Sequence, residues 1–336
     1  MKNKLYALKE AQDLLEEGVT AIVGADESLL KQLPKGKWIG GTMPYFMAEN
    51  GGTFSQDKVF LHHLDDRFQI NQIKHYEEHQ LESIFDDYPT WGVSFIIIPS
   101  LSEVAFRYPF VTNKNIDVLK SPLIGWLSGV LWDNVGKVDP KVIDGQTCTF
   151  YGNQALVMHC DLPKNVNPSL GTINILEPTG PIIEFEEETT EISEAIIDGK
   201  KQNLYEYLKS SNAGIQQPFI TDVSGSLINT SIKELDDTNK LVKVWTPTWP
   251  GYQYQLSKVV DNYEEKFENE LKAINKEMVF NCNCLYNYLF GNLEGKKIGD
   301  VTGLITFGEI AYLLLDQTMV YLTLEEEEHD HQSVIA

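Results

Sequence analysis

Hydrophobic residues along this chain follow two spacings, one typical of strands and one typical of helices. The stretch "WGVSFIIIPS" at residues 91–100 is apolar on both faces of an extended backbone, which predicts a strand in the centre of a sheet. Shorter apolar runs at residues 19–24, 37–41 and 278–284 predict further strands. Because helix-like stretches lie among the strands in both halves, the sequence predicts an α/β or α+β fold with mixed sheets.

Apolar residues three or four positions apart predict several helices. The first covers residues 1–18, with Leu5 and Leu15 on its apolar face and Gly18 at its end. Asp26 is the expected cap of the second helix, because its side chain can accept a hydrogen bond from the first turn. The predicted helices after the first lie at residues 27–36, 69–89, 200–212 and 263–277.

Turn-forming residues between apolar runs predict hairpins. Residues 45–64 are expected to turn at Asn50-Gly51-Gly52, where a positive φ is tolerated, and residues 147–162 at Gly152-Asn153. In the second half we expect a long strand over residues 240–256. The stretches 303–315 and 318–326 are expected to form a pair that turns at Asp316-Gln317.

The length of 336 residues exceeds what one ordinary hydrophobic core holds, which favours two lobes. The stretch "NVNPSLG" at residues 165–171 is the expected boundary. We therefore expect two lobes of mixed β-sheet flanked by helices, over residues 1–170 and 171–325. An acidic, flexible tail is expected at residues 326–336.

Charge and hydropathy exclude several classes of partner. The formal net charge is −22, from 49 acidic and 27 basic residues, so the field of the chain repels nucleic acids and anionic membranes. No apolar run approaches the roughly 20 residues that a membrane span requires, and the start carries no secretory signal. We expect a cytoplasmic protein. Arginine, the usual bidentate partner of a carboxylate, occurs only as Arg67 and Arg107.

The stretch "GKWIGGTMPYFMAENGG" at residues 36–52 is the first candidate site. Gly40, Gly41 and Thr42 follow a predicted strand, and glycines there would let a ligand approach the backbone closely. The stretch lacks the glycine spacing of nucleotide-binding loops, and no long helix follows at once. The alternatives are a ligand pocket and a structural bend of the strand.

The C-terminal quarter resembles the FIST family, which is named for F-box and intracellular signal-transduction proteins. The resemblance rests on an apolar strand ending at Asn281 and Cys282, followed by Gly308-Glu309-Ile310. In the first half, "WIGGT" at residues 38–42 and "SPLIGWLSG" at 121–129 resemble the strand-to-glycine motifs of the N-terminal FIST domain. The stretch "LYNYLFG" at 285–291 departs from the family because it lacks the arginine that many FIST domains carry after the cysteine.

The resemblance implies a small-molecule sensory or regulatory domain with an amino-acid-like ligand and a separate signalling protein as partner. It does not imply catalysis, a cofactor or a metal. We expect one pocket between the lobes, in which Arg107 holds an acid group and Glu309 an amine or hydroxyl. The other expected ligand-binding residues of this pocket are Gly40, Gly41, Thr42, Tyr45, Trp126, Asn281 and Cys282. Alternatively, Glu309 caps a turn and Arg107 lies on the surface.

Two other functions stay open. One is a thiol-dependent enzyme with Cys282 as nucleophile, assisted by Glu309 or by a histidine such as His159. The other is a non-catalytic scaffold that binds only proteins. A metal site is not expected, because Cys282 and Cys284 lack two further ligands at suitable spacing. His75 and His79 would lie on the exposed face of the helix predicted for residues 69–89.

Overall fold

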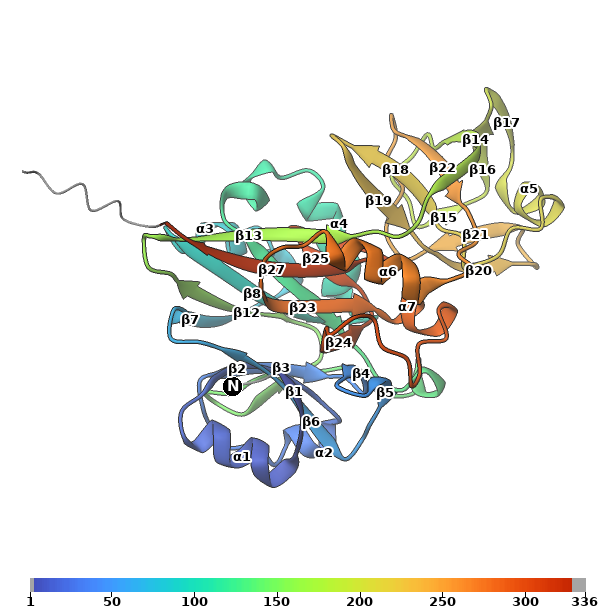
Figure 1. The fold of residues 1–336 in the computed structure, drawn as a ribbon. Helices are drawn as coiled ribbons and strands as arrows, with labels where there is room; N and C mark the ends of the chain where they lie inside the picture. Colours follow the sequence, from blue (N-terminus) through green and yellow to red (C-terminus); the bar gives the residue numbers. More distant parts are fainter. Residues whose placement is uncertain (1–2, 328–336) are drawn as a thin grey trace, which may run out of the picture.

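The computed structural model describes residues 3–327, and these residues form a mixed α/β fold, as the sequence predicts. The described strands belong to five sheets (Figure 1). Within the described residues, no helix is long and apolar enough to cross a membrane. Most of the expected acidic tail, residues 328–336, lies outside the described residues.

The first sheet lies beside two helices near the N-terminus. α1 (Leu8–Glu16) buries Ala11 and Leu15, and the side chain of Asp26 caps α2 (Glu27–Leu30). The helix predicted for residues 1–18 is shorter than expected, because its first turn forms a strand that pairs with β6. The sheet order is β1 (Lys4–Ala7), β6 (Lys58–Leu64), β2 (Thr20–Ala25), β3 (Trp38–Thr42), β10 (Val142–Asp144) and β11 (Thr149–Tyr151).

The second sheet contains the apolar strand that the sequence places at its centre. β8 (Gly92–Pro99) is buried over its whole length, with a parallel neighbour on one side and an antiparallel neighbour on the other, which confirms the prediction. α3 (Ser83–Asp86) and α4 (Glu103–Thr112) contribute to the apolar cluster on one face of this sheet. The sheet order is β26 (Leu313–Leu315), β25 (Glu309–Ala311), β9 (Leu123–Ser128), β8, β12 (Ala155–Asp161) and β7 (Gln69–Tyr76).

The helix predicted for residues 69–89 is wrong in its first half. Residues 69–76 form the edge strand β7, whose register on β12 runs from Tyr76 opposite Ala155 to Gln69 opposite Asp161. Only short helical turns follow, in the 3-10 helix η1 (Glu78–Gln80) and in α3. Apolar residues three apart fit a helix face, but pairing with the buried strand β12 decides the backbone conformation here.

The third sheet joins the two ends of the chain. β24 (Gly303–Thr306) pairs with β4 (Tyr45–Ala48), and β25 pairs with β9 of the second sheet. The expected boundary at residue 170 falls inside β13 (Val166–Ile173), which pairs along its length with β27 (Met319–Glu326). The segments expected as two lobes thus share two sheets. The order is β13, β27, β23 (Met278–Cys284), β24, β4 and β5 (Gly51–Phe54).

Two further predictions of strand pairing are corrected by the structure. The hairpin expected at residues 147–162 does not form, because β11 pairs with β10 in the first sheet and β12 joins the second sheet. The stretches 303–315 and 318–326 do not pair as one hairpin either, because β24, β25 and β26 lie in two different sheets. In both places the chain leaves one sheet at a turn and enters another.

Residues 178–257 form a separate group of strands with an apolar core of its own, which we call the β unit. It occupies the upper right of Figure 1 and carries α5 (Leu204–Ser210). The strand expected at 240–256 is two strands, because Pro247 and Pro250 interrupt the segment between them.

The strands of the β unit belong to two sheets. One has the order β17 (Lys200–Asn203), β16 (Glu194–Ile197), β14 (Pro178–Glu184), β22 (Gln253–Ser257), β18 (Phe219–Val223) and β19 (Ser226–Thr230). The other has the order β15 (Glu191–Ile192), β21 (Leu241–Val244) and β20 (Ile232–Asp236). After the β unit, α6 (Tyr263–Lys272) and α7 (Leu285–Phe290) flank β23, and short 3-10 turns lie at Ile116–Lys120 and Trp132–Asn134.

Candidate functional site

A cavity of about 240 Å³ lies where the second sheet, the C-terminal strands and the β unit meet. Parallel strands β8 and β9 both end at this place, and the carboxyl edge of a sheet is where α/β proteins commonly bind ligands. The residues that line the cavity are Ser100, Leu101, Ser102, Ala105, Phe106, Leu127, Trp132, Val135, Thr190, Lys233, Val244, Trp245, Cys284, Leu285, Tyr286, Thr306, Phe307, Leu314 and Asp316.

One wall of the cavity is the turn between β8 and α4. Leu101 has a φ of 61°, which is unusual for a residue other than glycine, and its side chain is half exposed at the cavity. Ser102 follows, and its Oγ accepts a hydrogen bond from the Ala105 amide at 3.1 Å, which caps α4. Ser100 is buried at the cavity, and its hydroxyl has no hydrogen-bond partner among the described residues. The turn therefore holds a buried hydroxyl group without a described partner beside the cavity.

The floor of the cavity carries Asp316, which lies between β26 and β27. Its Oδ2 accepts hydrogen bonds from the Ser231 amide at 3.2 Å and from the Thr246 hydroxyl at 3.0 Å, both in the β unit. Burial raises the pKa of Asp316 to about 6. This carboxyl group can thus lose or gain a proton close to neutral pH.

Glu309 lies behind the floor and is completely buried. Its carboxyl group accepts hydrogen bonds from the hydroxyl groups of Thr306 at 3.0 Å and Thr318 at 3.2 Å, and from the Thr318 amide at 3.4 Å. Burial, and then the nearby charge of Asp316, raise its pKa well above the usual value. Thr306 lines the cavity and Glu309 does not, so one hydroxyl group separates Glu309 from the cavity surface.

Aromatic side chains form much of the remaining wall. The Trp132 ring lies 6.1 Å from the Tyr286 ring and 6.4 Å from the Phe307 ring, measured between centroids. The Trp245 indole N–H donates to the Tyr286 hydroxyl at 2.8 Å, which joins the β unit to α7. The Lys233 ammonium group lies 4.6 Å from the centre of the Trp245 ring. Among the described lining residues, Lys233 is the only base and Asp316 the only acid.

The expected glycine site is part of the packing between sheets. Gly40 and Gly41 are buried in β3, and a Cβ added to Gly41 would lie 2.7 Å from the Trp126 ring and 2.9 Å from Ser128. The missing side chain thus makes room for Trp126. The Thr42 hydroxyl accepts a hydrogen bond from the Lys141 amide at 3.0 Å. These observations favour the structural alternative, in which the glycine stretch accommodates a neighbouring strand.

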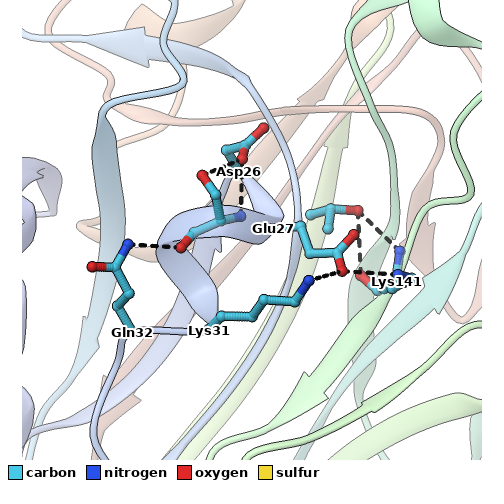
Figure 2. Close-up of polar contacts among 7 residues, drawn as sticks. Asp26, Glu27, Lys31, Gln32 and Lys141 are labelled. Carbon is cyan, nitrogen blue, oxygen red and sulfur yellow. Dashed lines mark hydrogen bonds and ion pairs between the residues drawn. The ribbon is translucent and has the colours of Figure 1, made fainter.

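Figure 2 shows the polar contacts beside this stretch. The Lys141 ammonium group lies 2.8 Å from a Glu27 carboxylate oxygen, and Lys31 reaches the same oxygen at 2.7 Å. Asp26 accepts hydrogen bonds from the amide and hydroxyl groups of Ser28 at 2.9 and 2.6 Å. These carboxylates are engaged in capping α2 and in ion pairs, so they hold α2 and the loop before β10 together.

Tyr45, Asn281 and Cys282 do not line the cavity. The Tyr45 hydroxyl accepts a hydrogen bond from the Trp132 amide at 2.9 Å, so Tyr45 holds a residue of the aromatic wall. Asn281 donates to the Thr302 carbonyl at 3.0 Å, and the Cys282 thiol lies 3.4 Å from the Gly125 carbonyl oxygen. Burial and Glu309 raise the pKa of Cys282 well above its usual value.

Arg107 is not part of the cavity. Its side chain is 52% exposed, and its Nε lies 4.0 Å from a Glu78 carboxylate oxygen. Ala105 and Phe106 line the cavity from α4, and each step along a helix turns the side chain by about 100°. Arg107 therefore lies on the surface, as the alternative interpretation held, and neither it nor Glu309 lines the cavity.

The histidines occupy places that the sequence did not indicate. His75 lies on β7, where its ring stacks on Tyr151 at 4.6 Å, and His79 lies in a 3-10 turn, so the two do not share a helix face. His159 is buried in β12, between the Ser94 hydroxyl at 2.8 Å from Nδ1 and the Tyr76 hydroxyl at 2.9 Å from Nε2.

The Tyr76 hydroxyl also donates to Asp87 at 2.9 Å, which completes a chain from serine to aspartate. Ser94 and His159 are completely buried, so this chain is a structural network in the second sheet. Among the described residues, no group of three or more histidine, cysteine, aspartate or glutamate side chains is arranged to hold a metal.

Several cavity residues were missed from the sequence. The sequence indicates Asp316 only as a turn residue, and it did not lead to the prediction of Ser100, Lys233, Trp245 or Tyr286 as site residues. The signal for Ser100 was present, because "PSLSE" combines the end of a buried strand with a helix cap. Lys233 and Trp245 gave no local signal, since only the folding of the β unit against the body brings them to Asp316.

Comparison with known proteins gives a family and no function. A search of curated proteins finds no match to this sequence. One family model matches residues 6–325, which is nearly the whole chain and includes every residue that lines the cavity. The chain belongs to DUF6976, a family of unknown function.

Proposed function

We propose that this protein is a small-molecule-binding module that acts as a cytoplasmic sensor or regulator, with its ligand in the cavity above Asp316. The observation that carries the proposal is the lining of the cavity by three parts of the fold at once: the carboxyl edge of the second sheet, the C-terminal strands and the β unit. A ligand in this place contacts all three and stabilises one arrangement of them, which is how a binding site reports its occupancy.

The cavity has the composition of a ligand site. Its wall is aromatic and aliphatic, with a small number of polar residues that include Thr306 and Asp316. The resemblance to FIST domains, which stays a proposal, points to the same kind of role. That role includes a separate signalling protein that reads the bound state.

The thiol-dependent alternative receives little support. A nucleophilic cysteine needs a lowered pKa, from a nearby cation or a helix N-terminus. Burial and Glu309 raise the pKa of both Cys282 and Cys284, although Cys284 lines the cavity. A scaffold that binds only proteins would not account for a cavity of this lining. Ligand binding is therefore the function that the geometry supports best.

A thermal-shift screen with a cavity-blocking variant tests the proposal. Val135 lines the cavity, so Val135→Trp should fill part of it, whereas the exposed Val138 in the same segment does not line it and Val138→Trp is the matched control. At a hundred times its dissociation constant, a ligand adds about 2.7 kcal/mol of stability. Compounds that stabilise the wild type and Val138→Trp should fail to stabilise Val135→Trp. Equal stabilisation of both variants would place the ligand elsewhere and contradict the proposal.

A further inference from the structure

The carboxyl groups at the cavity have no paired cation within the described part of the chain. Asp316 on its floor and Glu309 behind it are both carboxyl groups, and neither forms an ion pair with a described residue. The one described base on the lining, Lys233, is exposed, and its ammonium group lies over the Trp245 ring. A buried carboxylate without a cation is costly, because it has lost its hydration. A cationic ligand group would remove that cost.

The Asp316 side chain can accept a further hydrogen bond from such a cationic group. Both of its hydrogen bonds, from Ser231 and from Thr246, go to Oδ2. Its Oδ1 has no hydrogen-bond partner among the residues that the structure describes, and Asp316 lines the cavity. A carboxylate can accept about four hydrogen bonds, so Oδ1 can accept from a ligand ammonium group while the β unit stays attached through Oδ2.

The cavity walls indicate the chemical character and size of the part of the ligand that does not contact Asp316. Trp132, Trp245, Tyr286 and Phe307 present aromatic surface to the cavity, and aromatic faces attract organic cations as well as apolar groups. The volume of about 240 Å³ is below the range of roughly 300–1,000 Å³ that is typical of pockets for drug-sized molecules. The cavity therefore fits a compact molecule with one apolar or aromatic group.

A carboxylate on the ligand finds no bidentate clamp, because the one described base on the lining, Lys233, is exposed and its ammonium group lies over the Trp245 ring. No arginine is among the lining residues, Arg107 faces solvent, and Arg67 is engaged with Asp65 and Glu326. The net charge of −22 also disfavours an anion. These observations favour a simple amine as the ligand over an amino acid or an organic acid.

We infer that the ligand class of this cavity is a small primary amine with an apolar or aromatic body and no carboxylate, whose ammonium group is held by Asp316. The inference rests on the proposed function and makes it specific, because it names the chemistry of the ligand. The amine would donate to Asp316 Oδ1, while its body packs on the aromatic wall.

Calorimetric titration with a matched set of compounds tests the inference. 2-Phenylethylamine is the probe, 2-phenylethanol its neutral analogue, phenylalanine its carboxylated analogue, and 3-phenylpropanoate an anion of similar size. The amine should bind at least tenfold more tightly than each of the other three. Equal or tighter binding of the alcohol, the amino acid or the acid would overturn the inference, yet leave the proposed function standing. Failure of all four to bind would also overturn it, while the cavity-blocking screen judges the proposed function independently.

Asp316→Asn supplies the matched variant. Asparagine keeps an acceptor for Ser231 and Thr246 but removes the charge, so amine affinity should fall roughly ten- to hundredfold, as for a lost charge-assisted pair. Asp144→Asn is the control, because Asp144 is a buried carboxylate in the first sheet that does not line the cavity. An unchanged amine affinity in Asp316→Asn would overturn the inference.

The pH dependence in the wild type keeps the inference testable if Asp316→Asn fails to fold. Glu309, Cys284, Tyr286 and Lys233 are the titratable groups that face Asp316 or share its cavity. Burial raises the pKa of Glu309 and of Cys284 well above their usual values, that of Tyr286 to about 12 and that of Asp316 to about 6. Amine affinity should fall as the pH drops below 6, about tenfold per pH unit. Affinity for 2-phenylethanol should stay constant. The titrations should run from about pH 4.5 to about pH 7.5, roughly one to two units either side of 6. An affinity for 2-phenylethylamine that stays constant over this range would overturn the inference.

Discussion

The Thr246 hydroxyl of the β unit donates a hydrogen bond of 3.0 Å to Asp316 Oδ2, on the floor of the cavity. This bond ties residues 178–257 to the C-terminal strands, beside the amide of Ser231, which reaches the same oxygen. The carboxyl group that we assign to ligand recognition is thus also an attachment point of the β unit. Ligand binding and the position of the β unit are therefore coupled through one side chain.

Replacing Thr246 with valine should destabilise the protein in a pH-dependent way. The change keeps the shape but removes a donor from a buried carboxyl group, which typically costs about 1–3 kcal/mol. The folded-state pKa of Asp316 is raised to about 6, so the group is charged above that pH and needs its donors most there. The loss in free energy of unfolding should be larger at pH 7.5 than at pH 5, roughly one unit either side of that pKa.

Chemical denaturation at the two pH values measures this difference. Thr248→Val is the control, because the Thr248 hydroxyl donates to the carbonyl oxygens of Glu187 and Thr189 inside the β unit, and not to a carboxyl group. Its destabilisation should be the same at both pH values. A pH-independent loss in Thr246→Val would contradict the attachment through a charged Asp316.

Gly41→Ala should destabilise the protein by about 1–3 kcal/mol, because an added methyl group overpacks the contact between the first and second sheets. The new Cβ would lie 2.7 Å from Trp126, 2.9 Å from the Ser128 Cβ and 3.0 Å from Ile97. Gly152→Ala is the control, since a Cβ there meets nothing within 4 Å. Urea denaturation should show a change below about 0.5 kcal/mol for the control. A neutral Gly41→Ala would show that the glycine is not required for packing.

The buried histidines should make the protein less stable as the pH falls. Burial lowers the pKa of His159 to about 4, from a usual value near 6.5. The folded state therefore resists protonation that the unfolded state accepts, so its stability is full above about pH 6.5 and declines between about pH 6.5 and pH 4. The linkage amounts to about 3 kcal/mol per histidine. His62 should contribute similarly, because its pKa is also lowered to about 4.

His159→Gln separates this contribution from the others. Glutamine can hydrogen-bond to Ser94 and Tyr76 but does not titrate, so the decline between pH 6.5 and pH 4 should become shallower than in the wild type. The variant should also lose some stability at pH 7, since its fit between the two hydroxyl groups is poorer. Denaturation series across this pH range check both effects. An unchanged slope would mean that folding does not lower the pKa of His159.

Thiol reactivity should follow burial. Cys148 is partly exposed, whereas Cys160 and Cys282 are completely buried and their pKa values are raised by burial, that of Cys160 to about 12. A small alkylating reagent should modify Cys148 in the native protein and spare the other two until the protein is denatured. Mass spectrometry of peptides after brief labelling measures this order. Rapid native labelling of Cys282 would revive the enzyme alternative.

Local patterns in the sequence determined those helices and strands that form regardless of which other elements they pack against. β8 is apolar on both faces and would lie at the centre of any sheet that it joins. α5 and α6 carry enough helical spacing to form within the ranges predicted for them, although residues 200–203 form the strand β17. The mixed α/β class follows from such elements alone. The weak, mixed pattern of residues 69–76 did not suffice, because an edge strand takes its conformation from its partner, here β12.

The candidate site was decided by the tertiary structure. The sequence suggested the glycine stretch, Arg107 and Glu309, each judged by its place after or within an apolar strand. The structure instead brings Ser100, Lys233 and Asp316 together, although these residues lie 83 or more positions apart along the chain. Pairing of β24 with β4 and of β25 with β9 makes this possible, because it returns the end of the chain to the beginning. Register between distant strands depends on contacts of the whole core, which no local spacing of residues encodes.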